Sequence, residues 1–334
     1  MKTNQRIKLS DLATALNLST STVSRALNDH PRIPIETRTK VKKLANDWAY
    51  HPNPFAKGLF SKETKTIGVM IPCFEDNYFS KILGIIEDEL IKKGYKLICT
   101  RSGKNAVEEQ SALWNLAKAH VDGIIAVLSY DQPCPAFIND INEEGIPILF
   151  LDRMYENVDA SFVISDDFQG AFEAVSYLIQ EGRSKILHLE GPRDLSTSFY
   201  RKQGYMEALK KHDLEIQHSI QCENKEDVKI KIKAYNNDYD AVFCYNDFYA
   251  FEMLEYAKQQ GICIPNEVAV IGYANDPLSS FTSPKLTTVD QSTSDLGEQS
   301  VKMLLSEIKA MKSKGSFEYS TFKSSTRLLV RESC

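Results

Sequence analysis

Residues 9–28, which read LSDLATALNLSTSTVSRALN, decide how the chain begins. Apolar residues recur at helical spacing in the first half of this stretch: Leu9, Leu12, Ala13 and Leu16. We expect a short helix there, with Ser10 as its N-cap. Asn17 tolerates a left-handed backbone, and Ser19 can cap a second helix from residue 20 to about 27. Two short helices joined by a tight turn form a helix-turn-helix.

The second predicted helix has two different faces. The side that would contact the first helix is apolar: Val23, Ala26 and Leu27. Thr20, Ser21 and Arg25 are left on the outer side. An arginine can bind guanine O6 and N7 with two hydrogen bonds, and hydroxyl side chains can meet base edges or phosphates in the major groove. The pattern favours DNA binding and leaves open a three-helix packing module whose second helix is only solvated.

Charge is divided unevenly along the 334 residues, whose formal net charge is −5. Residues 1–65 contain 12 basic and 5 acidic residues, a net charge of +7, so residues 66–334 carry −12. A small basic module joined to an acidic body indicates one part that meets a polyanion and another that does not. The chain length also predicts more than one domain, because single cores rarely exceed about 250 to 300 residues.

The remainder of the chain alternates apolar strands with amphipathic helices. We expect a first series of strands at residues 66–72, 96–100, 123–128, 147–151 and 162–165, and a second series at 185–189, 241–244 and 268–271. Helices are expected at residues 79–93, 107–119, 168–181, 201–211 and 248–260. Continuous apolar strands separated by helices predict doubly wound parallel sheets, and two series predict two α/β lobes.

Several classes of protein are disfavoured by composition and motifs. The seven cysteines and six histidines have no metal or redox spacing, and no G-x-G, Walker or nucleophile-elbow pattern occurs. The polar start does not resemble a signal peptide, and the longest strongly apolar stretch, residues 123–130, is far shorter than the roughly 20 residues of a membrane helix. We therefore expect a cytoplasmic protein that is not an enzyme, with no catalytic residues, cofactor, metal or membrane partner.

Residues 9–28 resemble the N-terminus of the LacI/GalR family of bacterial transcription regulators. The likeness continues through Thr37-Arg38, Tyr50-His-Pro-Asn53 and Ala56-Lys-Gly-Leu59. The family binds palindromic operators as dimers, so the resemblance implies double-stranded operator DNA as a partner, and a homodimer. It implies base reading by Thr20, Ser21 and Arg25. Contacts mainly to the DNA backbone are implied for Thr22, Asn28, Tyr50 and Asn53.

The same resemblance implies a hinge helix over residues 52–60 that lies in the minor groove of bound DNA. Leu59 matches the leucine that opens a central base step, and the contacts of the bent duplex repay the unstacking cost of such a wedge. Ala56 is small enough for close approach to the groove, and Lys57 can meet a phosphate. Ordinary packing remains the alternative for Leu59. Pro34 stands where the family usually has a capping serine, so one cap or phosphate contact is expected to be missing.

The larger part of the chain resembles the periplasmic-binding-protein-like effector core of this family. The landmarks are RKQGY from Arg201, CYND from Cys244, IPNEVAVIGY from Ile264, PKLTTVDQ from Pro284 and LVRE from Leu329. Ligands of such folds lie at the carboxyl ends of strands, in the cleft between lobes. The expected effector-binding residues are Tyr78, Phe79, Asp152, Arg153, Arg201, Asn246, Asp247 and Gln291.

The chemistry of these residues fits a small polar effector such as a sugar or sugar derivative. A guanidinium donates hydrogen bonds, an amide donates and accepts them, and a carboxylate accepts them, so together they can satisfy several hydroxyls. The alternatives are a helix cap for Asp247, a core position for Phe79, and an ion pair with Asp166 or Asp167 for Arg201.

Two departures from the family bear on the ligand. Ala274 stands where the family commonly has an aspartate that accepts sugar hydroxyls, and residues 222–225 show no aromatic platform. A main anchor for a simple monosaccharide is therefore absent. The sequence leaves open an unusual ligand, a ligand held mainly by the other lobe, or weakened sensing.

The sequence as a whole predicts a helix-turn-helix headpiece over residues 1–50, a hinge and linker over 51–65, and an effector-binding and dimerisation core over 66–334. We expect an N-lobe of about 66–165 plus 292–322 and a C-lobe of about 166–291 plus 323–334. The expected function is operator binding by a repressor under allosteric control of a small polar effector. The alternatives are a solute-binding protein of a transport system and a regulator that senses a non-sugar metabolite such as a nucleobase.

Overall fold

The computed structural model describes residues 7–50, 63–102, 105–128, 135–155, 158–215, 219–235 and 238–334. The chain forms two compact units, Met1–Thr64 and Lys65–Cys334. Within the described ranges, every helix is too short or too polar to cross a membrane.

Three short helices build the first unit: α1 (Leu9–Ala15), α2 (Thr20–Leu27) and α3 (Ile35–Asp47). Asn17 adopts the predicted left-handed conformation in the turn after α1, with φ of 52°. Ser19 caps α2 as predicted, because its Oγ accepts the Thr22 amide at 3.1 Å. Apolar side chains from all three helices form one small core: Leu12, Ala13, Val23, Ala26, Ile33, Val41 and Ala45. The predicted helix-turn-helix is therefore confirmed as a folded unit.

The caps of α1 and α3 do not use a serine. Ser10 lies inside α1, so the prediction that it caps this helix is wrong. Lys8 is the N-cap residue, and the Asp11 carboxylate accepts the Lys8 amide at 2.8 Å. A carboxylate in the first helical turn reaches back to this amide and also stabilises the positive end of the helix dipole. Pro34 precedes α3 without a side-chain cap, as expected from the sequence.

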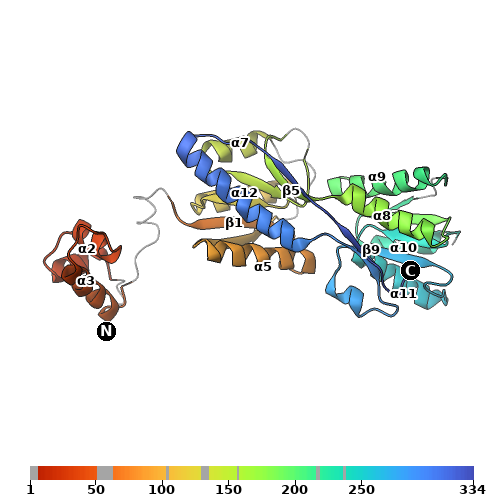
Figure 1. Ribbon diagram of the computed structural model, residues 1–334, viewed down its shortest axis with the longest axis horizontal. Coiled ribbons are helices and arrows are strands. Elements are labelled where there is room, and N and C mark those ends of the chain that lie inside the picture. The colour runs from red at the N-terminus through yellow and green to blue at the C-terminus, as the bar shows by residue number, and fades with distance from the viewer. Residues whose placement is uncertain are drawn as a thin grey trace. The chain divides into compact units, whose positions relative to one another are not determined.

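The first sheet of the second unit has the strand order β11-β5-β4-β3-β1-β2, with every pair parallel. Strands β1 and β5 of this sheet are labelled in Figure 1. Its strands are β1 (Thr66–Ile71), β2 (Lys96–Arg101), β3 (Gly123–Ala126), β4 (Ile148–Leu151), β5 (Ser161–Ser165) and β11 (Thr321–Ser324). One face packs against α5 (Asn77–Lys92) and α12 (Thr293–Lys314), and the other against α6 (Ala106–Lys118) and α7 (Pro135–Glu143). The sheet is thus buried between two helical layers.

The second sheet has the order β12-β10-β9-β8-β6-β7 and is parallel except for β12, which runs antiparallel to β10. Its strands are β6 (Ile186–Glu190), β7 (Ser219–Gln221), β8 (Ala241–Cys244), β9 (Ala269–Tyr273), β10 (Thr287–Asp290) and β12 (Arg327–Leu329). One face packs against α8 (Asp167–Gln180) and α9 (Ser196–Lys211), and the other against α10 (Lys225–Ala234) and α11 (Asp247–Gln260). A short 3₁₀ helix, η1 (Pro277–Ser280), follows β9.

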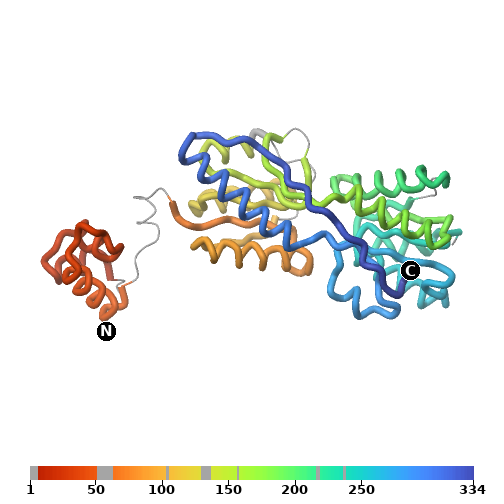
Figure 2. Tube along the Cα trace, viewed as in Figure 1, coloured from red at the N-terminus to blue at the C-terminus, as the bar shows by residue number. Residues whose placement is uncertain are grey.

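The chain passes between the two sheets three times, as the trace in Figure 2 shows. The passages lie between β5 and α8, between β10 and α12, and between β11 and β12. The Ser165 hydroxyl donates to the Gln291 carbonyl at 3.5 Å, and the Ser292 hydroxyl donates to the Ser325 carbonyl at 3.1 Å. These bonds join the three passages to one another, which makes them a shared hinge between the lobes.

Every strand predicted from the sequence is present, but four strands were not predicted: β7, β10, β11 and β12. Each has only three or four residues, and β11 (TFKS) is mixed in polarity, so neither an apolar run nor a strict alternation marks it. The start of α9 also differs, since it lies at Ser196 rather than Arg201. Close packing of α9 on α8 requires Gly204, where a Cβ would lie 2.3 Å from the Phe168 carbonyl oxygen.

Glu307 is a buried carboxylate on α12. Its Oε2 has no hydrogen-bond partner in the part of the chain that the structure describes. Burial raises the pKa of Glu307 to about 7, although a hydrogen bond with Ser161 opposes the rise. The folded protein therefore holds a proton on this side chain more tightly than the unfolded chain does.

We expect Glu307→Gln to change the pH dependence of stability. Because the folded-state pKa lies above the ordinary 4.5, the free energy of unfolding of the parent falls as pH rises from there to about 7. Glutamine has a similar shape and cannot ionise. The free energy of unfolding of the variant should therefore equal that of the parent near the low end of this pH range and exceed it by about 1–3 kcal/mol at about pH 8. Urea denaturation at both pH values measures this, and a difference that is the same at both would contradict the assignment.

Candidate functional site

The outer face of α2 presents the three side chains that the sequence assigned to base reading. Thr20, Ser21 and Arg25 are exposed, whereas Val23 and Ala26 are fully buried against the other helices. The fold therefore exposes two short hydroxyl side chains and one guanidinium on a single helix, with Ser21 Oγ lying 2.8 Å from Ser19 Oγ. Such a face has the size and the donors that the major groove accepts.

The remaining predicted DNA contacts lie around this helix or beyond the described residues. Thr22 is half-buried, with its Oγ1 2.8 Å from Ser19 Oγ. Asn28 is exposed and ends α2, where its Nδ2 donates to the Ser24 carbonyl at 2.8 Å. Tyr50 packs against the small core of the first unit, and this burial raises the pKa of its hydroxyl. Asn53, Ala56, Lys57 and Leu59 fall outside the residues that the structure describes.

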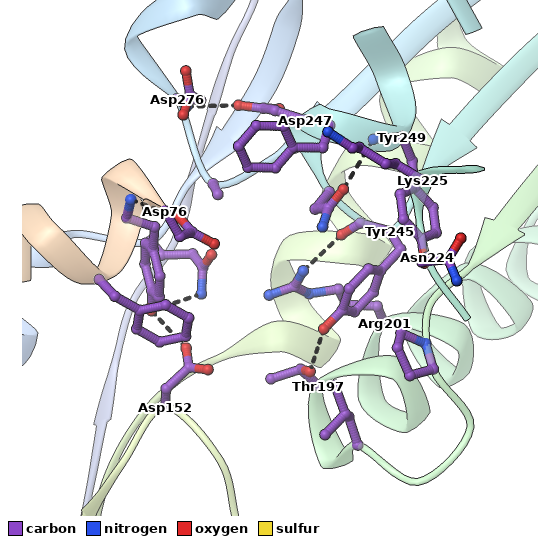
Figure 3. Close-up of a pocket in the computed structure, with 18 of the residues that line it drawn as sticks. Asp76, Asp152, Thr197, Arg201, Asn224, Lys225, Tyr245, Asp247, Tyr249 and Asp276 are labelled. Carbon is purple, nitrogen blue, oxygen red and sulfur yellow. Dashed lines mark hydrogen bonds between the residues drawn. The ribbon is translucent and has the colours of Figure 1, made fainter. Parts of the chain in front are cut away.

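A cavity of about 470 Å³ lies between the two lobes of the second unit, at the carboxyl ends of the strands. The structure brings together in its lining all eight predicted effector residues: Tyr78, Phe79, Asp152, Arg153, Arg201, Asn246, Asp247 and Gln291. In Figure 3, Asp76 and Asp152 lie on one side of the cavity, and Arg201, Tyr245 and Thr197 face them from the other.

The first-lobe wall is held by a buried chain of hydrogen bonds. The Tyr78 hydroxyl donates to Asp152 Oδ1 at 2.6 Å and accepts from Gln291 Nε2 at 3.1 Å. Gln291 Nε2 also lies 3.2 Å from Ser165 Oγ, at the hinge. Burial and the charge of Asp152 raise the pKa of Tyr78 well above its ordinary value, so this hydroxyl stays protonated and remains a donor. The chain therefore connects the cavity wall to the hinge.

The second-lobe wall is built around Arg201. Its Nε donates to Asp167 Oδ1 at 2.8 Å and one terminal nitrogen donates to the Tyr245 carbonyl at 2.6 Å. The guanidinium lies 3.7 Å from the centre of the Tyr273 ring and 4.8 Å from that of Tyr245. Burial opposes the charge on Arg201, but Asp167 nevertheless holds its pKa above the ordinary value. Burial raises the pKa of Asp167 to about 6, with the Arg201 charge opposing that rise.

The alternatives left open by the sequence are now decided for two side chains. The ion pair between Arg201 and Asp167 is confirmed, in the second turn of α9 rather than at its start. Asp247 does not cap α11, because Asn246 does so by accepting the Tyr249 amide at 3.0 Å. Asp247 instead accepts the Thr288 hydroxyl and the Asp276 amide, each at 2.6 Å, and burial raises its pKa to about 6.

Phe79 is both a core residue and a cavity residue. It packs in the core of the first lobe with 6% of its surface exposed, and it also lines the cavity. The core alternative for Phe79 is therefore confirmed, and the same position makes the residue part of the cavity lining.

Several cavity residues were not predicted. Tyr245 offers an aromatic ring whose hydroxyl lies 2.9 Å from Thr197 Oγ1, and it lines the cavity together with residues 223–225, a stretch that has no aromatic residue of its own. Asp276 brings a carboxylate two residues after Ala274, and Asn77 Nδ2 of the other lobe donates to its Oδ2 at 2.9 Å. Their position in the sequence was the signal that could have identified them, because Tyr245 follows β8 and Asp276 follows β9.

A metal centre does not emerge from these side chains. Across the described ranges, no group of three or more histidine, cysteine, aspartate or glutamate residues is arranged to hold a metal ion. The cavity instead offers hydrogen-bond donors and acceptors together with aromatic rings, which suits a small organic ligand with several polar groups.

The fold and the cavity define a class of protein in which a helix-turn-helix unit is joined to a two-lobed ligand-binding unit. Residues 8–53 match the family described as bacterial regulatory proteins, lacI family, and residues 64–328 match periplasmic binding proteins and sugar binding domain of LacI family. The chain belongs to the LacI family of bacterial regulatory proteins.

Individual relatives agree with this assignment. The ribose operon repressor of Bacillus subtilis (strain 168) is 32% identical over 305 residues, which cover 90% of this chain and 91% of the relative. The solved complex of the transcriptional regulator CelR with cellobiose is 25% identical, covers 98% of this chain and 100% of its own, and has a TM-score of 0.74. The lac repressor dimer bound to operator and the anti-inducer ONPF has a TM-score of 0.86 at 22% identity. The match covers 98% of this chain and 99% of the lac repressor chain, and it supports the fold.

We expect Tyr78→Phe to lower the free energy of unfolding by about 1–3 kcal/mol, because it removes one buried partner from Asp152 and from Gln291 while the ring is retained. Tyr200→Phe is the matched control, since this ring is 36% exposed on α9 and its substitution should stay within about 0.5 kcal/mol. Urea denaturation monitored by circular dichroism compares the two. Equal losses in both variants would contradict a structural role for the chain of hydrogen bonds.

Proposed function

We propose that this protein is a transcription repressor that binds a palindromic operator as a homodimer and whose operator affinity changes when a small polar effector fills the cavity. The observation that carries the proposal is the presence in one chain of an exposed recognition face on α2 and a polar cavity between two hinged lobes. A relative named ribose operon repressor, 32% identical over 90% of this chain, supports repression.

In this proposal Thr20, Ser21 and Arg25 read base edges. Thr22, Asn28 and Tyr50, together with Asn53, contact mainly the DNA backbone. Ala56, Lys57 and Leu59 belong to the proposed hinge helix over residues 52–60, with Leu59 as the wedge in the minor groove. The headpiece would span residues 1–50 and the hinge and linker residues 51–65.

The effector is proposed to lie in the cavity of the core, residues 66–334, between the N-lobe of about 66–165 plus 292–322 and the C-lobe of about 166–291 plus 323–334. Carboxylates of the first lobe, such as Asp152, would accept hydroxyl hydrogens, while Arg201 and Asn246 of the second would donate to hydroxyl oxygens. A hydroxylated ligand that satisfies both walls stabilises the closed arrangement of the lobes. CelR is solved with cellobiose, which supports a sugar or sugar derivative here.

The hinge supplies the coupling between the two sites. Gln291 lines the cavity and also bonds to Ser165 at the hinge, so ligand contacts bias how the lobes are held. Because the coupling is a free energy between two binding events, operator DNA and effector change each other's affinity by the same factor. The proposal assigns no catalytic reaction, and a regulator of this kind acts where bacterial DNA lies, in the cytoplasm.

The test of the proposed function is an unbiased selection of duplex DNA by the purified full-length protein, with and without a metabolite mixture. We expect enrichment of an inverted repeat and a steep loss of affinity with rising salt, because counterions are released from the phosphates. Enrichment of no sequence in either condition, or a flat salt response, would overturn the proposal and favour a solute-binding protein.

We expect Arg25→Ala to weaken binding to the selected operator by about 1–3 kcal/mol and to relax the preference at one base pair. Lys40→Ala is the control, because this exposed lysine lies on α3 and pairs with Glu36 at 2.8 Å. Fluorescence anisotropy with operator and random duplexes measures both variants. An equal loss on operator and random DNA would remove Arg25 from base reading.

A further inference from the structure

The charges that line the cavity do not balance. Five lining residues carry carboxylates: Asp76, Asp152, Glu223, Asp247 and Asp276. Three carry cations: Arg153, Arg201 and Lys225. Glu223 and Lys225 are exposed at the rim, where solvent screens them, so the imbalance lies in the buried part. There, four carboxylates meet two guanidinium groups.

Both guanidinium groups already have an acidic partner. Arg201 pairs with Asp167, which stands behind the cavity wall, at 2.8 Å. Arg153 Nε lies 3.7 Å from Asp152 Oδ2, and its terminal nitrogen donates to the Leu128 carbonyl. A phosphate group of a ligand would therefore have to compete with buried aspartates for either cation. An anion is also costly to bury beside further carboxylates.

Three of the four buried lining carboxylates are left over: Asp76, Asp247 and Asp276. Asp247 accepts the Thr288 hydroxyl and the Asp276 amide. Among the described residues Asp76 and Asp276 likewise have no ion pair, and their hydrogen bonds come from neutral donors. Asp76 caps α5 by accepting the Tyr78 amide at 2.8 Å, and Asp276 accepts from Asn77 Nδ2 at 2.9 Å. Burial, with the charges of Asp152 and Asp276, raises the pKa of Asp76. A positive ligand group beside Asp76 would lower the electrostatic energy of Asp76, Asp152 and Asp276.

The rest of the lining suits the same ligand. The rings of Phe79, Tyr245 and Phe248 line the cavity together with these carboxylates. Aromatic faces attract an ammonium group as well as the apolar face of a sugar ring. Arg153 also lines the cavity, and its guanidinium group can donate to a neutral hydroxyl oxygen of a ligand.

From this arrangement, and resting on the proposed function, we propose that the effector is a hydroxylated amine, such as an amino sugar, whose ammonium group sits against Asp76 and Asp276, and that phosphorylated sugars are excluded. The hydroxyl groups of the ligand would meet Asp152, Arg153 and Arg201. The proposal narrows the effector from any small polar molecule to one that carries a positive charge.

Matched ligands test this inference on the full-length protein. Isothermal titration calorimetry compares D-glucosamine, D-glucose and D-glucose 6-phosphate, and the corresponding galactose series, at a pH at which the amines are protonated. We expect at least one amine to bind about tenfold or more tightly than its neutral partner, and the phosphates to bind about tenfold or more weakly. Phosphates that bind as tightly as the neutral sugars, amines without an advantage, or no binding by any of the six would overturn the proposal.

Substitution of Asp76 separates charge from shape. Asp76→Asn keeps an N-cap acceptor for α5 and removes the charge, so the affinity ratio of amine to neutral sugar should fall to about threefold or less. Asp88→Asn, on the exposed side of the same helix and outside the cavity lining, should leave that ratio unchanged. An unchanged ratio in Asp76→Asn would show that Asp76 does not meet the ligand amine.

Operator selection shows whether the proposed function has failed or only the proposed class of effector. A protein that enriches an inverted repeat yet shows no amine preference retains the proposed function and loses only the effector class. A protein that enriches no sequence loses the proposed function itself, whatever the sugar titrations show.

Discussion

The ion pair between Arg201 and Asp167 is the interaction on which the second lobe and its cavity depend. Asp167 opens α8 directly after the first passage between lobes, and Arg201 comes from the adjacent α9. The guanidinium also reaches the ends of β8 and β9 through the Tyr245 carbonyl and the Tyr273 ring. Removal of one member would leave an uncompensated buried charge, at a cost of about 3–5 kcal/mol. The pair therefore fixes four elements and the cavity wall at once.

Much of the fold follows from local patterns in the sequence. The left-handed Asn17 and the Ser19 cap determine the turn before α2, and the buried strand Ala241–Cys244 is bounded as its apolar run predicts. The first cap was misassigned because Asp11 and Ser10 are both suitable acceptors, and only the three-dimensional path of the chain before α1 decides between them. Short edge strands such as β12 are set by pairing with β10, which no local pattern records.

The residues that line the cavity could be predicted only in part. Side chains that follow apolar strands, such as Asp152 and Asn246, could be placed because carboxyl ends of parallel strands meet at one edge. Asp276 was missed because its place depends on how the loop after β9 turns toward Asn77 of the other lobe, and Tyr245 was missed although it follows β8 directly. The bond from Asn77 to Asp276 joins residues 199 positions apart, a relation that only the three-dimensional fold reveals.

The three passages between the lobes have a consequence for biosynthesis. The first sheet takes its edge strand β11 and its covering helix α12 from the last 42 residues of the chain, Thr293 onward. Leu296, Val301, Leu304 and Ile308 of that helix complete the core over β3, β4 and β5. A nascent chain on the ribosome therefore carries an open apolar sheet until α12 and β11 have been synthesised. Products that end before Thr293 keep that surface exposed and are substrates for chaperones and proteases rather than competent partial regulators.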